Sequence, residues 1–345
     1  MIHDIRDSSV QFTNYSLDIA NMLEQVFSIE SQADFERTCL DVFRHQYAHN
    51  NIYRQYADYV KKGVEAVHTI NEIPFLPIEF FKTQTVYSSS KDPKITFHSS
   101  GTTGSLTSKH LVADLNWYEE SFKKCFSTFY GDAQDIAILA LLPSYLERSG
   151  SSLIYMVDDL IHQSNQSESG YFLYNHQDLY QTLLALHEKG TKTILMGVTY
   201  ALLDFCENYT LNFPELIVME TGGMKGKRKE MIRPELHQIL CTGFGVSQIH
   251  SEYGMTELLS QGYSTGQGVF RTPQWMKIRI RDTNDPFTYL ADGKTGAINV
   301  IDLANYNSCA FIATQDLGKH RPDDSFEILG RFDNSDIRGC NLLVQ

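Results

Sequence analysis

The sequence predicts an α/β fold of layered, mainly parallel sheets and helices that closes with an antiparallel β subdomain. Two observations predict it. Short apolar runs alternate with helical patterns through the middle of the chain, as in parallel strands connected by helices. Beyond Gly262 the pattern changes to alternating polar and apolar residues separated by turns, which is typical of antiparallel strands. At 345 residues, 42% of them hydrophobic, the chain can bury a sizeable core.

We expect one domain over residues 1–345, with a helical part over 1–95, an α/β core over 96–262 and a β part with a tail over 263–345. The first helix is predicted by a stripe of apolar residues at helical spacing, namely Ile19, Met22, Leu23, Val26 and Phe27. A second helix is expected over about 33–47.

The central part predicts strands at 136–142, 193–196 and 215–219. The first of these runs is apolar throughout, so it is expected to be buried on both faces. A helix is expected to begin at a capping Asp178, to run through His187 and to stop at a left-handed Gly190. Another helix is expected over about 200–209.

The last part predicts antiparallel strands. The stretch KIRIRD (277–282) alternates in polarity, GAINVIDL (296–303) is strand-like, and LADGKTG (290–296) supplies a turn between them.

Composition excludes some classes of function. A formal net charge of −13 disfavours a nucleic-acid partner, so an anionic substrate must be met by local backbone N–H groups, a few basic side chains or a metal. We see no signal peptide and no apolar run near the ~20 residues that a membrane span needs. The six cysteines form no C-x-x-C pair, which disfavours a zinc site and a disulfide framework and favours a reducing cytoplasm.

The first candidate site is FHSSGTTGSLTSKH (97–110), where residues 99–106 hold five hydroxyl side chains and two glycines. It fits neither phosphate fingerprint, because Leu106 stands where a Walker loop needs lysine and G-x-G-x-x-G is absent. Glycines nevertheless let a backbone turn its N–H groups toward an anion, and hydroxyls add donors. The loop is either a phosphate cradle or a solvated surface loop.

Three further segments carry candidate chemistry. In SEYGMTE (251–257), Tyr253 could stack on a base, Thr256 could donate to a phosphate and Glu257 could hold Mg²⁺, although turns commonly carry such residues. The nearby TGFG (242–245) is interpreted as the end of a helix. METGGMKGK (219–227) follows a predicted strand, at the sheet edge where α/β proteins bind ligands.

The fourth segment is the last part of the chain, with TQDLG (314–318) and LGRFDNSDIRGC (329–340). Asp316 is an acceptor of the kind that binds ribose hydroxyls, and Arg331 could donate to them.

Taken in order, these segments resemble the adenylate-forming superfamily of acyl-CoA synthetases, firefly luciferase and peptide-synthetase adenylation domains. Its phosphate loop, Ser-Ser/Gly-Gly-Thr-Thr-Gly, is matched by residues 99–104. Its Tyr-Gly-x-Thr-Glu motif is matched by 253–257, and its Asp-Leu-Gly and Gly-Arg-x-Asp motifs by 316–318 and 330–333. Four matches in the same order over about two thirds of the chain are specific.

The resemblance implies the roles of individual residues. The ATP phosphates would be held by Ser99, Ser100, Gly101, Thr102, Thr103 and Gly104. Tyr253 would lie on adenine, beside Gly254; Thr256 would contact the α-phosphate, Glu257 would bind Mg²⁺, and Asp316 and Arg331 would bind the ribose. Gly222 and Gly223 would line the nucleotide or acyl pocket.

Two departures from the superfamily pattern matter. The family loop continues x-Pro-Lys-Gly, whereas here Lys109, counted as catalytic with Thr256, comes two residues later and is followed by His110. Typical members also continue into a small mobile domain with a catalytic lysine, whereas this sequence ends at Gln345.

One branch that ends in this way is similar over nearly the whole sequence. The acyl-protein synthetases, or long-chain-fatty-acid–luciferin-component ligases, share IPFLPIEFFK, LLPSYLERSGSSLIYMVD and the RGC ending. The resemblance implies that a fatty acid is activated as acyl-AMP with ATP and Mg²⁺, and that the acyl group passes to Cys340. Arg338 would favour the thiolate. An acyl reductase or another acyl-accepting protein would follow.

Two alternatives stay open. One is an acyl-CoA ligase of the phenylacetate-ligase type whose C-terminal domain is a separate chain. The other is a non-catalytic protein that binds nucleotide or acyl groups.

Overall fold

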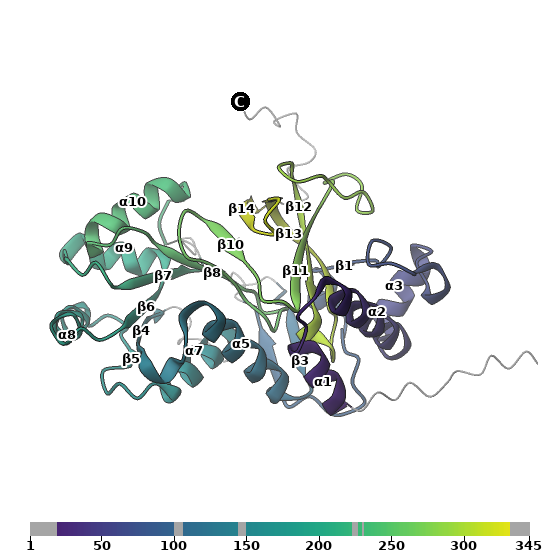
Figure 1. Cartoon of the computed structure of the whole chain (residues 1–345), viewed down its shortest axis with the longest axis horizontal. Coiled ribbons are helices and arrows are strands. Elements are labelled where there is room, and N and C mark those ends of the chain that lie inside the picture. Colours follow the sequence, from purple (N-terminus) through teal and green to yellow (C-terminus); the bar gives the residue numbers. More distant parts are fainter. Residues whose placement is uncertain (1–18, 100–105, 144–149, 223–226, 230, 332–345) are drawn as a thin grey trace, which may run out of the picture.

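The computed structural model describes residues 19–99, 106–143, 150–222, 227–229 and 231–331 (Figure 1). The helices are α1 (Ile19–Phe27), α2 (Gln32–His49), α3 (Asn51–Tyr59), α4 (Phe80–Thr83), α5 (Leu115–Tyr130), α7 (Ser152–Gln163), α8 (His176–Lys189), α9 (Thr199–Asn208) and α10 (Arg233–Phe244). Short 3₁₀ turns are η1 (Val64–Ala66), η2 (Ala133–Asp135) and η3 (Leu303–Asn305). The fold is α/β, as predicted.

The strands fall into two sheets. A two-stranded hairpin holds β2 (Ile95–His98) and β3 (Lys109–Val112). The large sheet holds β1 (Leu76–Pro77), β4 (Ala137–Leu141), β5 (Gly170–Tyr171), β6 (Thr193–Val198), β7 (Ile217–Thr221), β8 (His250–Tyr253), β9 (Gly262–Ser264), β10 (Val269–Arg271), β11 (Met276–Arg281), β12 (Thr295–Asp302), β13 (Phe311–His320) and β14 (Phe326–Arg331). Its hydrogen-bonded order is β11-β12-β13-β14-β10-β9-β8-β7-β6-β4-β5, with β1 beside β13.

One half of the large sheet is parallel. β5, β4, β6, β7 and β8 pair in parallel. Every residue of β4 is buried, as its purely apolar run predicts, and every residue of β6 is buried as well. In Figure 1, α9 and α10 lie on one side of these strands and α5 and α7 on the other. β7 ends at Thr221, two residues later than predicted, so Gly222 follows the strand directly.

The other half is antiparallel, as predicted beyond Gly262. β9 pairs antiparallel with β8, and β10, β14, β13, β12 and β11 continue in the same sense. The two halves therefore share one hydrogen-bonded path rather than forming separate sheets. Their junction is β8, whose last residue is Tyr253.

Helix ends follow the predicted glycines. α8 stops at Gly190 and α10 at Gly245, with φ of 63° and 68°, a region that glycine enters without strain. The predicted cap at Asp178 is wrong, because α8 begins two residues earlier, after Asn175. Asp178 lies in the first turn, where its charge still faces the positive end of the helix dipole.

The N-terminal helices pack on the antiparallel half through a buried amide. Gln46 of α2 donates from Nε2 to the carbonyls of Asn305 (2.9 Å) and Tyr306 (3.0 Å), and its Oε1 accepts from the N–H of Ala310 (3.0 Å). The amide thus satisfies three backbone groups of the turn between β12 and β13, which buried polar groups require.

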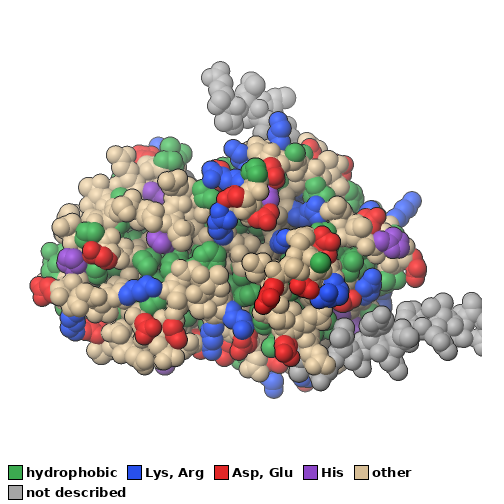
Figure 2. All heavy atoms as spheres, in the orientation of Figure 1, with side chains coloured by type: hydrophobic (Ala, Val, Ile, Leu, Met, Phe, Trp, Pro, Cys, Tyr) green, Lys and Arg blue, Asp and Glu red, His purple; other side chains and the backbone are tan. Residues whose placement is uncertain are grey.

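In the described part of the chain, the helices lack the combination of length and apolar character that crossing a bilayer requires. On the face drawn in Figure 2, basic and acidic side chains are interspersed rather than gathered into one basic patch.

Candidate functional site

Tyr253, Asp316 and Arg331 meet where the two halves of the sheet join. The Tyr253 hydroxyl donates to Oδ2 of Asp316 at 2.8 Å, across 63 residues of sequence. Asp316 and Arg331 are direct partners between β13 and β14, and Arg331 Nε lies 3.7 Å from Oδ1 of Asp316. Burial raises the pKa of Asp316, although the Tyr253 hydroxyl and the Arg331 charge oppose that rise. The structure thus brings together the residues predicted to bind the adenine base and the ribose of ATP.

The Tyr253 ring is held between two phenylalanine rings. It packs against Phe270 and Phe326 with centroid distances of 6.3 and 5.8 Å, both nearly perpendicular. Only 8% of the residue is exposed. A ring held in this way keeps its orientation without a ligand.

The β2–β3 hairpin closes the hydroxyl-rich loop at its base. The N–H of Ser108 donates to Oγ of Ser99 at 2.8 Å, and the N–H of Ser99 donates to the carbonyl of Ser108 at 3.1 Å. Ser99 therefore accepts a bond at the neck of the loop and keeps its own hydroxyl proton for another partner. The remaining predicted phosphate ligands, Ser100, Gly101, Thr102, Thr103 and Gly104, lie outside the described residues.

The base of this hairpin touches the second motif. Nδ1 of His110, on β3, lies 2.7 Å from the carbonyl oxygen of Thr256, across 146 residues. Lys109 is exposed, and since neighbouring strand residues point to opposite faces, it faces away from His110. The hairpin flanks and the Thr256–Glu257 peptide are therefore neighbours.

Glu257 is a buried carboxyl group beside the hairpin. Its exposed fraction is 5%, and burial raises its pKa, while the neighbouring Ser108 side chain and the more distant charges of Arg331 and Lys82 oppose the rise. Within the residues that the structure describes, Glu257 has no ion-pair partner. A carboxylate that is desolvated without a counter-ion is costly, so the site suits a cation.

The donor set fits Mg²⁺ rather than a metal held by protein alone. The described residues contain no cluster of three or more His, Cys, Asp or Glu side chains that could hold a metal. Magnesium commonly binds one or two carboxylates together with substrate phosphates and water. Glu257 supplies one such carboxylate next to the β2–β3 hairpin.

The segment that follows Thr256 is fixed by buried polar side chains. Asn305 Nδ2 donates to the Glu257 carbonyl at 2.6 Å. Oδ2 of Asp302 accepts from the N–H groups of Leu259 (2.8 Å) and Ser260 (3.0 Å), and Oδ1 accepts from Oγ of Ser260 (2.6 Å). Asp302 is fully buried, so these bonds hold the loop rigidly in a fixed position.

Sequence reasoning missed His110, Asp302 and Asn305 as site residues. A signal for Asp302 existed, because an acidic residue ending the apolar run GAINVID needs a buried partner. His110 lies in the alternating strand KHLV, which indicates only that its side chain faces inward. Asn305 follows in a turn, where asparagine is ordinary.

A further buried carboxylate, that of Glu220 on β7, links β8 to the start of α9. Oε1 of Glu220 accepts from Oγ of Ser251 at 2.8 Å, and Oε2 accepts from Oγ1 of Thr199 at 3.1 Å. Burial alone would raise the Glu220 pKa, but His237, Arg233 and Ser251 outweigh it and the pKa is lowered. Gly222, two residues on, is exposed with φ of 74°; Gly223 lies outside the described residues.

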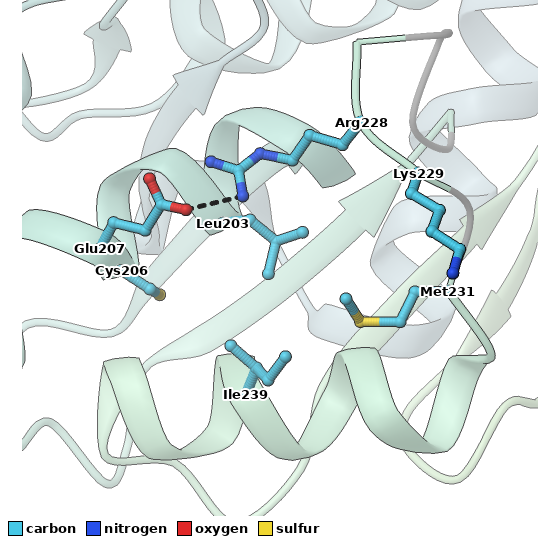
Figure 3. A pocket seen from close by; sticks show the side chains of 7 residues that line it. All are labelled: Leu203, Cys206, Glu207, Arg228, Lys229, Met231 and Ile239. Carbon is cyan, nitrogen blue, oxygen red and sulfur yellow. Dashed lines mark hydrogen bonds and ion pairs between the residues drawn. The ribbon is translucent and has the colours of Figure 1, made fainter.

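A cavity of about 390 Å³ lies elsewhere, between α9 and α10 (Figure 3). It is lined by Leu203, Cys206, Glu207, Arg228, Lys229, Met231 and Ile239. Arg228 is bound to Glu207 and Asp204, so its charge is compensated. None of these lining residues is a predicted site residue.

Comparison with known proteins agrees with this geometry. The family model "Acyl-protein synthetase, LuxE" matches residues 18–118. The long-chain-fatty-acid–luciferin-component ligase of Vibrio harveyi is 23% identical over 351 residues, 92% of this chain and 89% of the relative. That of Aliivibrio fischeri is 22% identical over 345 residues, 92% of this chain and 90% of the relative. The resemblance to acyl-protein synthetases is thus confirmed over nearly the whole chain.

Solved structures support the fold. ATP-bound MatB from Rhodopseudomonas palustris has a TM-score of 0.52 at 17% identity, covering 71% of this chain and 49% of that one, so this chain spans about half of its length. An open 2-hydroxyisobutyryl-CoA ligase, in complex with 2-HIB-AMP and CoA, has a TM-score of 0.58 at 11% identity, covering 88% of this chain and 71% of that one. The fold is that of adenylate-forming enzymes.

Proposed function

We propose that this protein is an ATP-dependent acyl-protein synthetase, which activates a carboxylic acid, with a long-chain fatty acid as the expected class, as acyl-AMP and transfers the acyl group to Cys340. The observation that carries the proposal is that the fold brings together predicted site residues from distant parts of the chain. Tyr253, Asp316 and Arg331 lie together, while Ser108 and His110 from the hairpin flanks lie against Thr256 and Glu257. The long-chain-fatty-acid ligases that match 92% of the chain supply the substrate class.

In this proposal the two groups of residues bind opposite ends of ATP. Asp316 and Arg331 bind the ribose hydroxyls, and Tyr253, with Gly254, lines the adenine site. The loop from Ser99 through Gly104 cradles the phosphates, with Lys109 following it, and the sheet edge at Gly222 and Gly223 lines the pocket where the nucleotide meets the acid. Glu257 would hold Mg²⁺, which would supply positive charge for the departing pyrophosphate.

The first step joins the acid to AMP. A carboxylate oxygen of the substrate attacks the α-phosphorus, an oxygen–phosphorus bond forms, and the bond to the β-phosphate oxygen breaks with its electron pair on pyrophosphate. Thr256 and the backbone N–H groups of the loop donate to the phosphate as charge develops. Donors that are already in position stabilise such charge without reorganisation. The hydrogen bonds of His110, Asn305 and Asp302 keep the Thr256 segment in a fixed position.

The second step transfers the acyl group to sulfur. The Cys340 thiolate attacks the carbonyl carbon of acyl-AMP, the carbon–sulfur bond forms, and AMP leaves with the electron pair of the broken carbon–oxygen bond. Supporting this choice, the five described cysteines are free, and burial raises the pKa of each one, to about 12 for Cys206 and Cys309. Such thiols are poor nucleophiles.

The thioester would serve an acyl reductase or another acyl-accepting protein. Consumption of ATP and the free described thiols fit a reducing cytoplasm.

The test is acid-dependent exchange of labelled pyrophosphate into ATP, screened over fatty, aromatic and amino acids with Mg²⁺. We expect exchange with a long-chain fatty acid and none without acid. Nucleotide binding without exchange for every acid would reject catalysis in favour of a binding protein. Acyl-CoA formation by the chain alone would instead favour a CoA ligase.

A further inference from the structure

His110 connects two parts of the predicted site that are far apart in sequence. It lies on β3, next to the neck of the hydroxyl-rich loop, and its Nδ1 contacts the Thr256 carbonyl at 2.7 Å. We propose that His110 is a positioning residue, which through its Nδ1–H bond fixes the Thr256–Glu257 peptide relative to the phosphate-loop hairpin. The role rests on the proposed function, since it concerns the placement of Glu257 and Mg²⁺ against ATP.

The ring is held firmly enough for this role. His110 is 1% exposed, and its ring packs perpendicular to that of Phe81 at a centroid distance of 5.8 Å. A buried, packed side chain keeps one rotamer, so the position of Nδ1 follows the backbone of β3. Movement of the hairpin would therefore move the donor.

The proton on the ring can be assigned from its partner. A carbonyl oxygen only accepts, so the short contact requires the proton on Nδ1. Burial lowers the His110 pKa to about 4, which keeps the ring neutral near pH 7 and leaves Nε2 without a proton. Nε2 has no hydrogen-bond partner in the described residues. The Asn305 side chain lies near the ring, but the only hydrogen bond of His110 within the described residues is the one through Nδ1.

The carbonyl that His110 holds determines where Glu257 lies. The Thr256 carbonyl and the Glu257 N–H share one rigid peptide plane. The next plane is held from η3, where Asn305 donates to the Glu257 carbonyl at 2.6 Å. Two consecutive planes on either side of the Glu257 α-carbon are thereby fixed, one of them from the hairpin. Asp302 fixes the residues that follow. Of these three side chains, those of His110, Asn305 and Asp302, only that of His110 lies on the hairpin.

A pair of isosteric variants separates this role from simple packing. In His110→Asn the amide nitrogen occupies the place of Nδ1, so the bond to Thr256 is kept. In His110→Gln the amide nitrogen occupies the place of Nε2, so the bond is lost although more of the ring volume is retained. A merely structural histidine predicts that the larger Gln is tolerated at least as well as Asn.

We expect His110→Gln to raise the KM for Mg·ATP in pyrophosphate exchange about tenfold, as loss of one buried bond allows, and His110→Asn to stay within about threefold of the wild type. Equal effects of the two variants, or a larger effect of Asn, would overturn the proposal. The rate at saturating Mg·ATP should change less than KM.

Amide hydrogen exchange in the protein without nucleotide gives a readout that needs no activity. His110→Gln should raise exchange over residues 255–260, while His110→Asn should match the wild type. If the wild type fails to exchange pyrophosphate with every acid, the proposed function fails, whereas this comparison still decides whether His110 positions the segment. Should His110→Gln not fold, nitrogen NMR of the wild-type histidines decides: a proton on Nε2 of His110 refutes the role, and one on Nδ1 supports it.

Discussion

The hydroxyl of Tyr253 is bonded to the carboxylate of Asp316 at 2.8 Å, which connects the last strand of the parallel half to the longest strand of the antiparallel half. Asp316 is aligned by register with Arg331 on its other side. A carboxylate between a phenol and a guanidinium has its oxygens oriented before any ligand arrives. Such preorganisation reduces the entropic cost of binding ribose hydroxyls.

Removal of the Tyr253 hydroxyl should therefore weaken nucleotide binding without unfolding the protein. In Tyr253→Phe the ring still packs on Phe270 and Phe326, but Asp316 loses an oriented donor. We expect the Kd for ATP to rise about tenfold, measured by calorimetry. The matched control is Tyr263→Phe, because Tyr263 is a buried tyrosine on β9 whose hydroxyl has no described hydrogen-bond partner. Equal losses in the two variants would contradict the importance of the bond to Asp316.

Glu257 and Glu220 should respond in opposite ways to loss of charge. Both are buried, but burial raises the pKa of Glu257, whereas the groups around Glu220 overcome burial and lower its pKa. Glu257→Gln should keep or increase stability while reducing pyrophosphate exchange by at least about 100-fold. Glu220→Gln should lower the free energy of unfolding by roughly 1–3 kcal/mol.

Urea unfolding and the exchange assay together check this pair. Stable and fully active Glu257→Gln would reject the metal role. An unchanged free energy of unfolding in Glu220→Gln would show that the hydrogen bonds and charges around Glu220 make no net contribution to stability.

How far the sequence predicts this site depends on how local each signal is. The stop of α8 at Gly190 and the buried run of β4 follow from neighbouring residues, so both were predictable. The contact of His110 with Thr256 spans 146 residues and leaves no periodic trace in either segment. The start of α8 shows the same limit on a small scale. The helix begins after Asn175, whereas the prediction chose Asp178, which lies in its first turn.

The meeting of Tyr253 with Asp316 is an intermediate case. Resemblance to a nucleotide-binding family implied that both residues face one nucleotide. Their direct hydrogen bond, and the support of Tyr253 by Phe270 and Phe326, depend on the register of β13 with β14 and on strand packing, which local patterns do not determine.

Mild acid should destabilise the protein because two buried histidines and the half-buried His45 resist protonation. Burial lowers the pKa of His45 to about 3 and of His110 and His250 to about 4, against 6.5 in the unfolded chain. Their stabilising contribution is complete above pH 6.5 and is lost as the pH falls from there toward the folded values. For the fully buried His110 alone, the loss by about pH 5.5 is about 1.4 kcal/mol.

Urea titrations at about pH 7.5 and 5.5 measure this effect. His110→Asn, which cannot titrate, should lose about 1.4 kcal/mol less than the wild type over that interval. Glu257, Asp302 and Asp316 have raised pKa values, so their protonation stabilises the folded state as the pH falls and opposes the trend. A wild type whose stability is constant down to about pH 5.5 would contradict the buried neutral state of these rings.

The acyl acceptor can be tested independently of adenylation. Cys340→Ala should leave fatty-acid-dependent pyrophosphate exchange near the wild-type rate, because the thiol enters only after acyl-AMP has formed.

The Cys340→Ala variant should lose the acyl label that the wild type acquires from radioactive fatty acid, ATP and Mg²⁺. Neutral hydroxylamine should release this label from the wild type, because a thioester is cleaved readily. Cys241→Ala is the matched control, since Cys241 is one of the two half-buried cysteines in the described residues, and burial still raises its pKa. Retention of the label in Cys340→Ala, or its loss in Cys241→Ala, would place the acceptor elsewhere. Loss of exchange in Cys340→Ala would instead mean that the thiol is needed to form acyl-AMP. That result would contradict a role for Cys340 in the second step alone.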